Sequence, residues 1–477
     1  QLNLVASDLR LAGLPDDDPA LVELRTAVEK ETGIPPALTD TLITALRGAD
    51  HLGSLLEVDQ AVEAAIEAHE KAGGVGRYLP TQADWLREVK PASLAFDAAK
   101  ARVSLLDQLE GFLARHTGGD DLGLRLRGEQ LAAGVRFVRT VREGGYDLVV
   151  ANPPYQGTSK MADAKYVEKQ YTLGKADLFA AFLLRGLDLA REGGVSAMLT
   201  MRNWMFIKQY AKLREHLLAT YDLRALHDLS SGAFEEINPA QVVVNVTSSI
   251  FARSANTDSA IALKVFDDET VTKQRETERK RAATLCHVGR HTFDPAALKV
   301  VPEWPLVYWW NHEELDTYTS SHPFGDIAPA VFGATTGDNT RFTRRPWECV
   351  LFPPFSAADK PWVPFINGAK GRAWLEELFE VIAWTSSGLA YRVFCERSSG
   401  ANYRSPELHF RRGIAFSMIG TEFTARVHRH PGIFGNKGSS LFPNDIASSV
   451  CNLNSTRCRA ILNSLNPGIG AEVGDLN

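Results

Sequence analysis

Cysteine is scarce in this chain: its 477 residues include five, and no two of them stand in a Cys-x-x-Cys arrangement. An odd number of cysteines argues against a disulfide framework. Cys451 and Cys458 are the closest pair, but no further cysteine or histidine follows them at the spacing of a zinc site. We therefore expect neither disulfide bonds nor a bound metal.

Long apolar runs and a strong positive charge are missing as well. No apolar stretch approaches the ~20 residues of a membrane span, and no signal peptide is visible, so we expect a cytoplasmic protein without a membrane partner. The net charge is −6, but residues 1–150 hold 16 Lys and Arg against 24 Asp and Glu, which leaves +2 for the rest. Contact with nucleic acid would therefore depend on local clusters after residue 150.

What the sequence does contain is a short apolar run, residues 146–151, that stops at Asn152. Its composition is typical of a buried parallel strand. Pro153 and Pro154 follow, and because neither can donate a backbone hydrogen bond, strand and helix are both excluded beyond it. Residues 152–155, which we name the elbow, should form a rigid turn at the carboxyl end of a strand, where open α/β sheets bind ligands.

The elbow suits chemistry on an exocyclic amine such as adenine N6. The amide oxygen of Asn152 and the backbone carbonyl of Pro153 can accept the two amine hydrogens and favour a pyramidal nitrogen that attacks a methyl donor. Tyr155 can stack on a base swung out of a duplex. An isolated Asn-Pro-Pro-Tyr also fits an ordinary Asx-type turn, but its place directly behind an apolar strand favours the catalytic interpretation.

The segment after the elbow, residues 156–174, is polar and carries Lys160, Lys165, Tyr166 and Tyr171. As a loop beside a flipped base it can close over DNA with its cations and aromatic rings. A merely solvated loop explains the same composition equally well.

Strands and helices alternate around the elbow, which predicts a doubly wound α/β sheet. Asp177 is placed to cap the helix that follows it. We expect strands over 146–151, 195–200 and 223–229, helices over 178–191 and 204–221, and two further strands at hairpin-like spacing over 242–251 and 261–266.

The region after Phe324 mixes short strand-like runs with glycine, proline and serine, and we expect one helix in it, residues 371–384. Its cations come in small groups, which suits phosphate contacts that position a protein on DNA while a few side chains read base edges. No carboxylate or cysteine completes a metal site with His428 and His430, so we expect basic contact or simple exposure for that pair. The cations are Arg341, Arg344, Arg345, Lys370, Arg372, Arg411, Arg412, Arg426, His428, Arg429 and His430.

Four stretches carry a family resemblance. They are Asn-Pro-Pro-Tyr-Gln-Gly-Thr-Ser-Lys-Met at 152–161, Lys-Ala-Asp-Leu-Phe at 175–179, Gly-Gly-Val-Ser-Ala-Met-Leu-Thr at 193–200, and Thr-Gly-Asp-Asn at 336–339 followed by Arg341-Phe342. The sequences of these stretches resemble those of the PglX-type methylases of BREX phage-defence systems and of the related type IIG restriction–modification enzymes. The similarity covers most of the chain from about residue 45 onward.

This resemblance implies a site-specific DNA adenine-N6 methyltransferase that takes its methyl group from S-adenosylmethionine. Double-stranded DNA is the implied substrate, and other phage-defence proteins are the implied partners. The resemblance assigns catalysis to Asn152, Pro153, Pro154 and Tyr155, and it places Asp177 near the cofactor end of the site. For DNA binding it favours Lys160 and Lys165, with Arg341, Arg344, Arg345, Arg411, Arg412 and Arg429 in a target-recognition domain.

The expected organisation is a mainly helical region over 1–145, the second half of a methyltransferase catalytic domain over 146–270, a linker over 271–323 and a truncated α+β target-recognition domain over 324–477. The family's cofactor motif, similar to Asp-Pro-Ala-Cys-Gly-Ser-Gly, is absent from residues 1–145. That absence predicts a fragment without the first half of the methyltransferase sheet. Two other functions stay open: a DNA-recognition subunit without catalysis, and a methyltransferase acting on RNA or on a protein amide.

Overall fold

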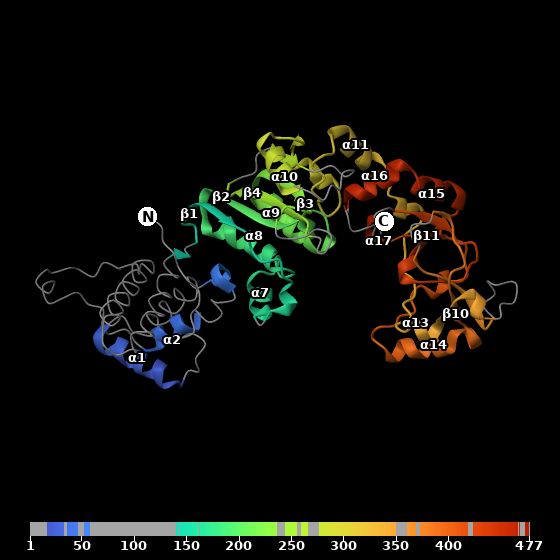
Figure 1. Cartoon of the computed structure of the whole chain (residues 1–477), viewed down its shortest axis with the longest axis horizontal. Helices are drawn as coiled ribbons and strands as arrows, with labels where there is room; N and C mark the ends of the chain where they lie inside the picture. The colour runs from blue at the N-terminus through green and yellow to red at the C-terminus, as the bar shows by residue number, and fades with distance from the viewer. Residues whose placement is uncertain are drawn as a thin grey trace, which may run out of the picture. The chain divides into compact units, whose positions relative to one another are not determined.

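The computed structural model describes residues 17–32, 36–45, 52–57, 140–141, 143–161, 163–235, 244–254, 259–265, 276–349, 360–368, 373–417, 423–465, 467 and 473–476. Figure 1 shows the elements in chain order. Contacts divide the chain into two compact units, which are described separately. Unit 1 comprises residues 1–202 and 215–292, and unit 2 comprises residues 203–214 and 293–477. The four functional ranges expected from the sequence remain predictions beside this division.

Unit 1 is built on a six-stranded sheet in the order β1-β2-β4-β3-β5-β6. β1 is parallel to β2, β3 is parallel to β5, and β4 runs antiparallel between β2 and β3. The predicted mixed α/β class with parallel strands is therefore confirmed. The strands are β1 (Tyr146–Ala151), β2 (Ala190–Met201), β3 (Asp222–Ser230), β4 (Val246–Ala252), β5 (Ala260–Lys264) and β6 (Arg290–Phe293).

Two expectations about this sheet are wrong. The strands at hairpin-like spacing, β4 and β5, are not neighbours, because β3 lies between them. β4 has buried residues on both of its faces, which is the environment of a central strand. β1 was expected to be buried, yet Leu148 is 58% exposed and Val150 is 70% exposed. β1 is the edge strand, and α8 packs on it without covering these two side chains.

Unit 1 also contains helices, and two of them differ from the bounds expected from the sequence. α8 (Leu178–Leu189) packs against β1 and β2, and it ends two residues before the expected Arg191 because β2 begins at Ala190. The expected helix 204–221 is α-helical only from Ala211, after two 3₁₀ turns. The other described helices are α1 (Pro19–Thr32), α2 (Pro36–Ala45), α7 (Ala164–Gln170), α10 (Glu276–Leu285) and α9 (Ala211–Thr220), whose first four residues fall in unit 2.

A buried arginine fastens residues 52–57 to α8. Arg185 is 1% exposed, and its Nε donates to the carbonyl of Ser54 at 2.7 Å while it also pairs with Glu143. The hydroxyl of Tyr171 donates to the carbonyl of Leu55 at 2.7 Å. A guanidinium has five donors, so one buried arginine can satisfy several carbonyls of an irregular segment.

Unit 2 contains two four-stranded sheets, in the orders β13-β8-β10-β7 and β14-β11-β12-β9. The strands are β7 (Thr343–Arg344), β8 (Trp362–Ile366), β9 (Trp374–Leu375), β10 (Val381–Ala383), β11 (Ile414–Phe416), β12 (Ala425–Val427), β13 (Ile433–Phe434) and β14 (Ser440–Leu441). The helices are α11 (His312–Ser320), α12 (Phe324–Ile327), α13 (Asn339–Phe342), α14 (Thr385–Arg397), α15 (Ile446–Leu453), α16 (Thr456–Leu465) and α17 (Val473–Leu476).

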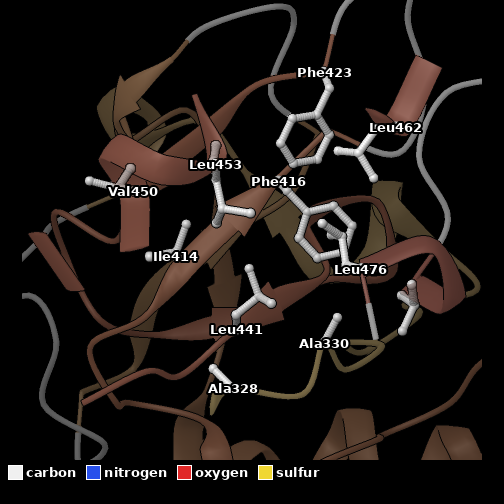
Figure 2. Packing of buried hydrophobic residues seen from close by; sticks show 12 residues of the cluster. Ala328, Ala330, Ile414, Phe416, Phe423, Leu441, Val450, Leu453, Leu462 and Leu476 are labelled. Carbon is white, nitrogen blue, oxygen red and sulfur yellow. The ribbon is translucent and has the colours of Figure 1, made fainter. Parts of the chain in front are cut away.

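Apolar side chains from β11, β14 and the last helices form one core of unit 2. Figure 2 shows Phe416 and Leu441 directed toward Leu453 and Leu476, and all four are at most 5% exposed. A second core, under α13 and α14, contains Phe342, Trp384 and Tyr391 among its members. These cores hold the short strands together, since strands of two or three residues make few ladder hydrogen bonds of their own.

The expected helix 371–384 is wrong for its described part. Residues 373–384 contain β9 and β10, and α14 begins only at Thr385. Ser386, Ser387 and Gly388 have left-handed backbone angles, so the right-handed helical turns of α14 run from Leu389 to Arg397. Val381 and Ile382 are completely buried and pair with β8, which is a typical position for β-branched residues in a sheet.

Candidate active site

The elbow emerges at the carboxyl end of β1 with its asparagine in the open. Asn152 and Pro154 are exposed, whereas Pro153 is buried. The hydroxyl of Tyr155 donates to Oδ1 of Asn152 at 2.9 Å. A carbonyl oxygen has two lone pairs, so this hydrogen bond orients the amide and leaves Oδ1 able to accept a second hydrogen.

The ring of Tyr155 lies beside Phe234. The two ring centroids are 6.4 Å apart with an interplanar angle of 48°, within the range of aromatic contacts. Burial raises the pKa of Tyr155 to about 12, so its hydroxyl stays protonated and remains a donor at neutral pH. Sequence reasoning missed Phe234. The available signal was its place four residues after Ser230, the end of β3, because parallel β3 ends at the same edge of the sheet as β1.

Asp177 lies directly beside the elbow. It is the N-cap of α8, and its carboxylate accepts from the backbone N–H of Phe179 at 3.4 Å. The backbone N–H groups of Gln156 and Leu178 act on the same carboxylate and lower its pKa, against the larger effect of burial. The N–H of Leu178 donates in turn to the carbonyl of Gln156 at 3.0 Å. Burial raises the pKa of Asp177 from its ordinary value. Asp177 therefore joins the start of α8 to the residue that follows the elbow, and its predicted contact with the cofactor remains a prediction.

The segment after the elbow is ordered by its tyrosines. It contains α7 and a 3₁₀ turn at Thr158–Lys160, not one continuous loop. The hydroxyl of Tyr166 accepts from the N–H of Glu57 at 2.9 Å, and Tyr171 is 3% exposed. The idea that the ring of Tyr171 stacks on a DNA base is therefore wrong, because this ring is buried. The ring of Tyr166 is half-buried, and its contact with DNA stays a prediction. Lys160 and Lys165 are exposed, so they remain candidates for phosphate contact.

The structure sorts the cations of unit 2 by what they contact. Arg344 donates to the carbonyls of Thr340 and Thr343. Arg345 donates to the carbonyl of Phe379 and lies 3.8 Å from a carboxylate oxygen of Glu380. The exposed members of the predicted set are Arg341, Arg411, Arg412 and Arg429, while Lys370 and Arg372 fall outside the described residues.

Two of the predicted surface cations are buried instead. Arg426 is 2% exposed, pairs with Glu376 and donates to the carbonyl of Asn367 at 2.9 Å. His428 is 3% exposed, with Nε2 at 3.0 Å from the hydroxyl of Ser440, and burial lowers the pKa of His428 to about 4. The expectation of surface contact fails for both. Arg426 lies in β12 and His428 directly follows this strand, so both side chains point to the same side, which faces the interior of the unit.

The described residues do not form an S-adenosylmethionine site. Such a site needs a glycine-containing turn that leads from a strand into a helix, and an acid for the ribose hydroxyls. β1 and β2 are followed by Asn152 and Arg202, and neither leads through such a turn, whereas β3 is followed by Ser231 and Gly232 and leads to residues outside the described set. Asp228, near the end of β3, is fully buried, and its two oxygens accept from Arg202 at 2.7 and 2.8 Å.

Comparison with known proteins confirms the family resemblance. Residues 99–234 match the family model of the Eco57I restriction-modification methylase. The chain is similar to the adenine-specific methyltransferase PglX of Lacticaseibacillus casei (strain Zhang), with 30% identity over an alignment of 354 residues. This match covers 69% of this chain and 29% of that protein. It is also similar to the adenine-specific methyltransferase BrxX of Escherichia coli O9:H4 (strain HS), with 27% identity over an alignment of 303 residues. This match covers 62% of this chain and 24% of that protein.

The chain thus spans less than a third of the length of each curated relative. Among solved structures, it is similar to a nuclease-deletion mutant of the Type ISP restriction-modification enzyme LlaGI in complex with a DNA substrate mimic. The TM-score is 0.44 and the identity 10%, over 98% of this chain and 45% of that one. None of the helices in the described part of the chain is long and apolar enough to cross a membrane.

Proposed function

We propose that this chain carries the amine-binding half of a site-specific DNA adenine-N6 methyltransferase of a phage-defence system. The observation that carries the proposal is the elbow: an exposed Asn152, oriented by Tyr155, at the carboxyl end of a parallel strand and next to a second aromatic ring. The names of the curated relatives, both adenine-specific methyltransferases, support the same chemistry.

The elbow acts on the adenine amine through two acceptors. Oδ1 of Asn152 and the carbonyl of Pro153 each accept one N6 hydrogen, which favours a pyramidal nitrogen whose lone pair is available for attack. The ring of Tyr155, with Phe234 beside it, gives the extracted base an apolar stacking surface. S-adenosylmethionine supplies the electrophilic methyl group, and its site requires residues beyond the described set.

The test uses the protein expressed from the complete reading frame, in a host without other adenine methylation. Mass spectrometry of digested host DNA measures N6-methyladenine. Removing a preorganised acceptor costs about 100- to 1,000-fold in rate, so Asn152→Ala should abolish detectable methylation. Asn452→Ala, which changes an exposed asparagine of α15, should leave it unchanged. Equal methylation by wild type and Asn152→Ala would remove the proposed mechanism.

A second candidate is a DNA-recognition subunit without catalysis, which uses the elbow only as scaffold. The missing cofactor motif favours it. It predicts DNA binding by the chain, and no N6-methyladenine from the complete reading frame in the same host. Methylation of RNA or of a protein amide would appear as methylated product in those fractions with none in DNA.

A further inference from the structure

Three arginines at one end of unit 2 lie over aromatic rings. The guanidinium carbon of Arg341 is 5.1 Å from the centroid of Phe342 and 5.3 Å from that of Phe394. Arg392 lies 5.9 Å from the centroid of Tyr403, and Arg404 lies 5.7 Å from that of Phe332. All three arginines are exposed, so each combines a fixed cation–π contact with guanidinium edges that face solvent.

The rings under Arg341 and Arg392 are held in place by a buried tyrosine. Tyr391 is 0% exposed and packs 5.4 Å from Phe342 and 6.0 Å from Tyr403, measured between centroids. Its hydroxyl is near two carbonyls, at 3.1 Å from that of Thr335 and 2.8 Å from that of Asn402. The three chain segments that carry these arginines are thereby joined. The arginines are preorganised, which lowers the entropy lost when they bind a partner.

These three arginines differ from other arginines of unit 2 in that no carboxylate pairs with them among the described residues. Arg345 and Arg426 each have a carboxylate partner, whereas no such pair involves Arg341, Arg392 or Arg404 among the described residues. The surrounding sequence is also biased: residues 385–412 hold five arginines, no lysine and two glutamates. Arginine is the residue best suited to bidentate contact with phosphate. This end of the unit is therefore complementary to an anionic backbone.

The positions of the arginines around α14 and the width of this helix both suit a DNA groove. Positions 392 and 394 lie about 200° apart around an α-helix, and Arg341 rests on Phe394, so Arg341 and Arg392 flank α14 on opposite sides. Between them, the outer face carries two apolar side chains, Leu389 at 56% and Val393 at 37% exposure, together with the exposed Glu396 and Arg397. A helix with its side chains is about 10–12 Å across, which fits the major groove of about 12 Å.

We propose that α14 enters the major groove of double-stranded DNA, with Arg341, Arg392 and Arg404 on phosphates and Leu389 and Val393 toward the base edges. We call these five residues the α14 surface. The proposal rests on the proposed function in taking duplex DNA as the substrate. It adds Arg392 and Arg404, which the sequence did not single out, and it excludes Arg344, Arg345 and Arg426 from the contact.

The test measures binding of the full chain to a labelled 30-base-pair duplex of random sequence by fluorescence anisotropy, between 50 and 200 mM salt. Non-specific binding is electrostatic, and each phosphate contact adds about 0.9 to the slope of log K against log salt. The triple variant R341Q/R392Q/R404Q should have a slope that is less steep than that of wild type by about 2.7. Across this salt range, wild type should then lose about 40-fold more affinity than the variant.

Two control variants test whether the effect depends on where the charges lie and on their being positive. Arg457→Gln makes the same charge change at an exposed position of α16, and Figure 1 shows α16 and α14 at opposite ends of unit 2. It should leave the slope as in wild type. The triple Arg→Lys variant keeps three charges and should keep the wild-type slope within one contact. Thermal unfolding followed by circular dichroism verifies that each variant folds.

An unchanged slope in the triple Gln variant, or an equal loss in Arg457→Gln, would overturn the α14 surface. Tighter binding of the single strand than of the duplex would also overturn it, since a groove is then not needed. These results leave the proposed function standing as long as the complete reading frame methylates DNA through Asn152. Absence of methylation, with the predicted change of slope, would instead refute the catalytic proposal and retain the surface.

Discussion

Replacing Asp177 distinguishes its observed structural role from the predicted role at the cofactor. The carboxylate caps α8, and it also interacts with the N–H of Gln156, the first residue after the elbow, which lowers the pKa of Asp177. Loss of an N-cap costs about 1 kcal/mol. Loss of the partner of a backbone N–H adds about 1 kcal/mol at an exposed residue such as Gln156, at the lower end of the range for buried groups.

Asp177→Ala should therefore destabilise the exit of the elbow by about 2 kcal/mol. This corresponds to about 30-fold faster exchange of the amides that open locally. Hydrogen–deuterium exchange with mass spectrometry, applied to peptides that cover residues 152–160 and 177–181, measures it on the chain itself. Asp177→Asn keeps an acceptor oxygen and should exchange within a few-fold of wild type.

The chain offers a matched control in Asp163, the N-cap of α7, whose side chain makes no capping hydrogen bond. Asp163→Ala should leave the exchange near α7 unchanged. If Asp177→Ala exchanges like wild type in both peptides, the carboxylate does not brace the elbow. If Asp177→Asn exchanges normally but loses methylation in the complete protein, the negative charge serves the reaction and not the cap.

Three further outcomes are expected. Tyr155→Phe keeps the ring but removes the hydrogen bond to Asn152, so methylation should fall by up to about tenfold. Tyr155→Ala also removes the ring and should lower methylation far more. If both variants lose methylation equally, the ring does not contribute to the reaction. Burial raises the pKa of Asp188 from 3.8 to about 6, so its ionised form is disfavoured in the fold, and stability is lost as pH rises through 6. Asp188→Asn should raise stability at pH 8 by up to about 3 kcal/mol and change nothing at pH 3, as measured by urea unfolding. Gly388 has φ +70°, and a Cβ there would lie 2.4 Å from the ring of Trp384, so Gly388→Ala should destabilise by about 2–4 kcal/mol; an unchanged urea midpoint would refute the contact.

The sequence by itself determined the features that local chemistry sets. An apolar run that meets two prolines must end there, so β1 was predicted to the residue. Asp177 caps α8 as expected because a capping side chain reaches only two or three residues along its own chain. The motifs around the elbow also identified the family resemblance that comparison then confirmed.

Only the tertiary structure decided which strands are neighbours and which charges are free. Spacing suggested a hairpin, yet β4 lies between β2 and β3, because pairing follows the burial of both faces and not the order along the chain. Arg426 and Arg341 look alike in sequence, but one is buried against Glu376 and the other lies exposed over Phe394. Whether a charge is paired or free depends on residues far away in the chain. Side-chain type alone therefore cannot predict which cations remain available to a ligand.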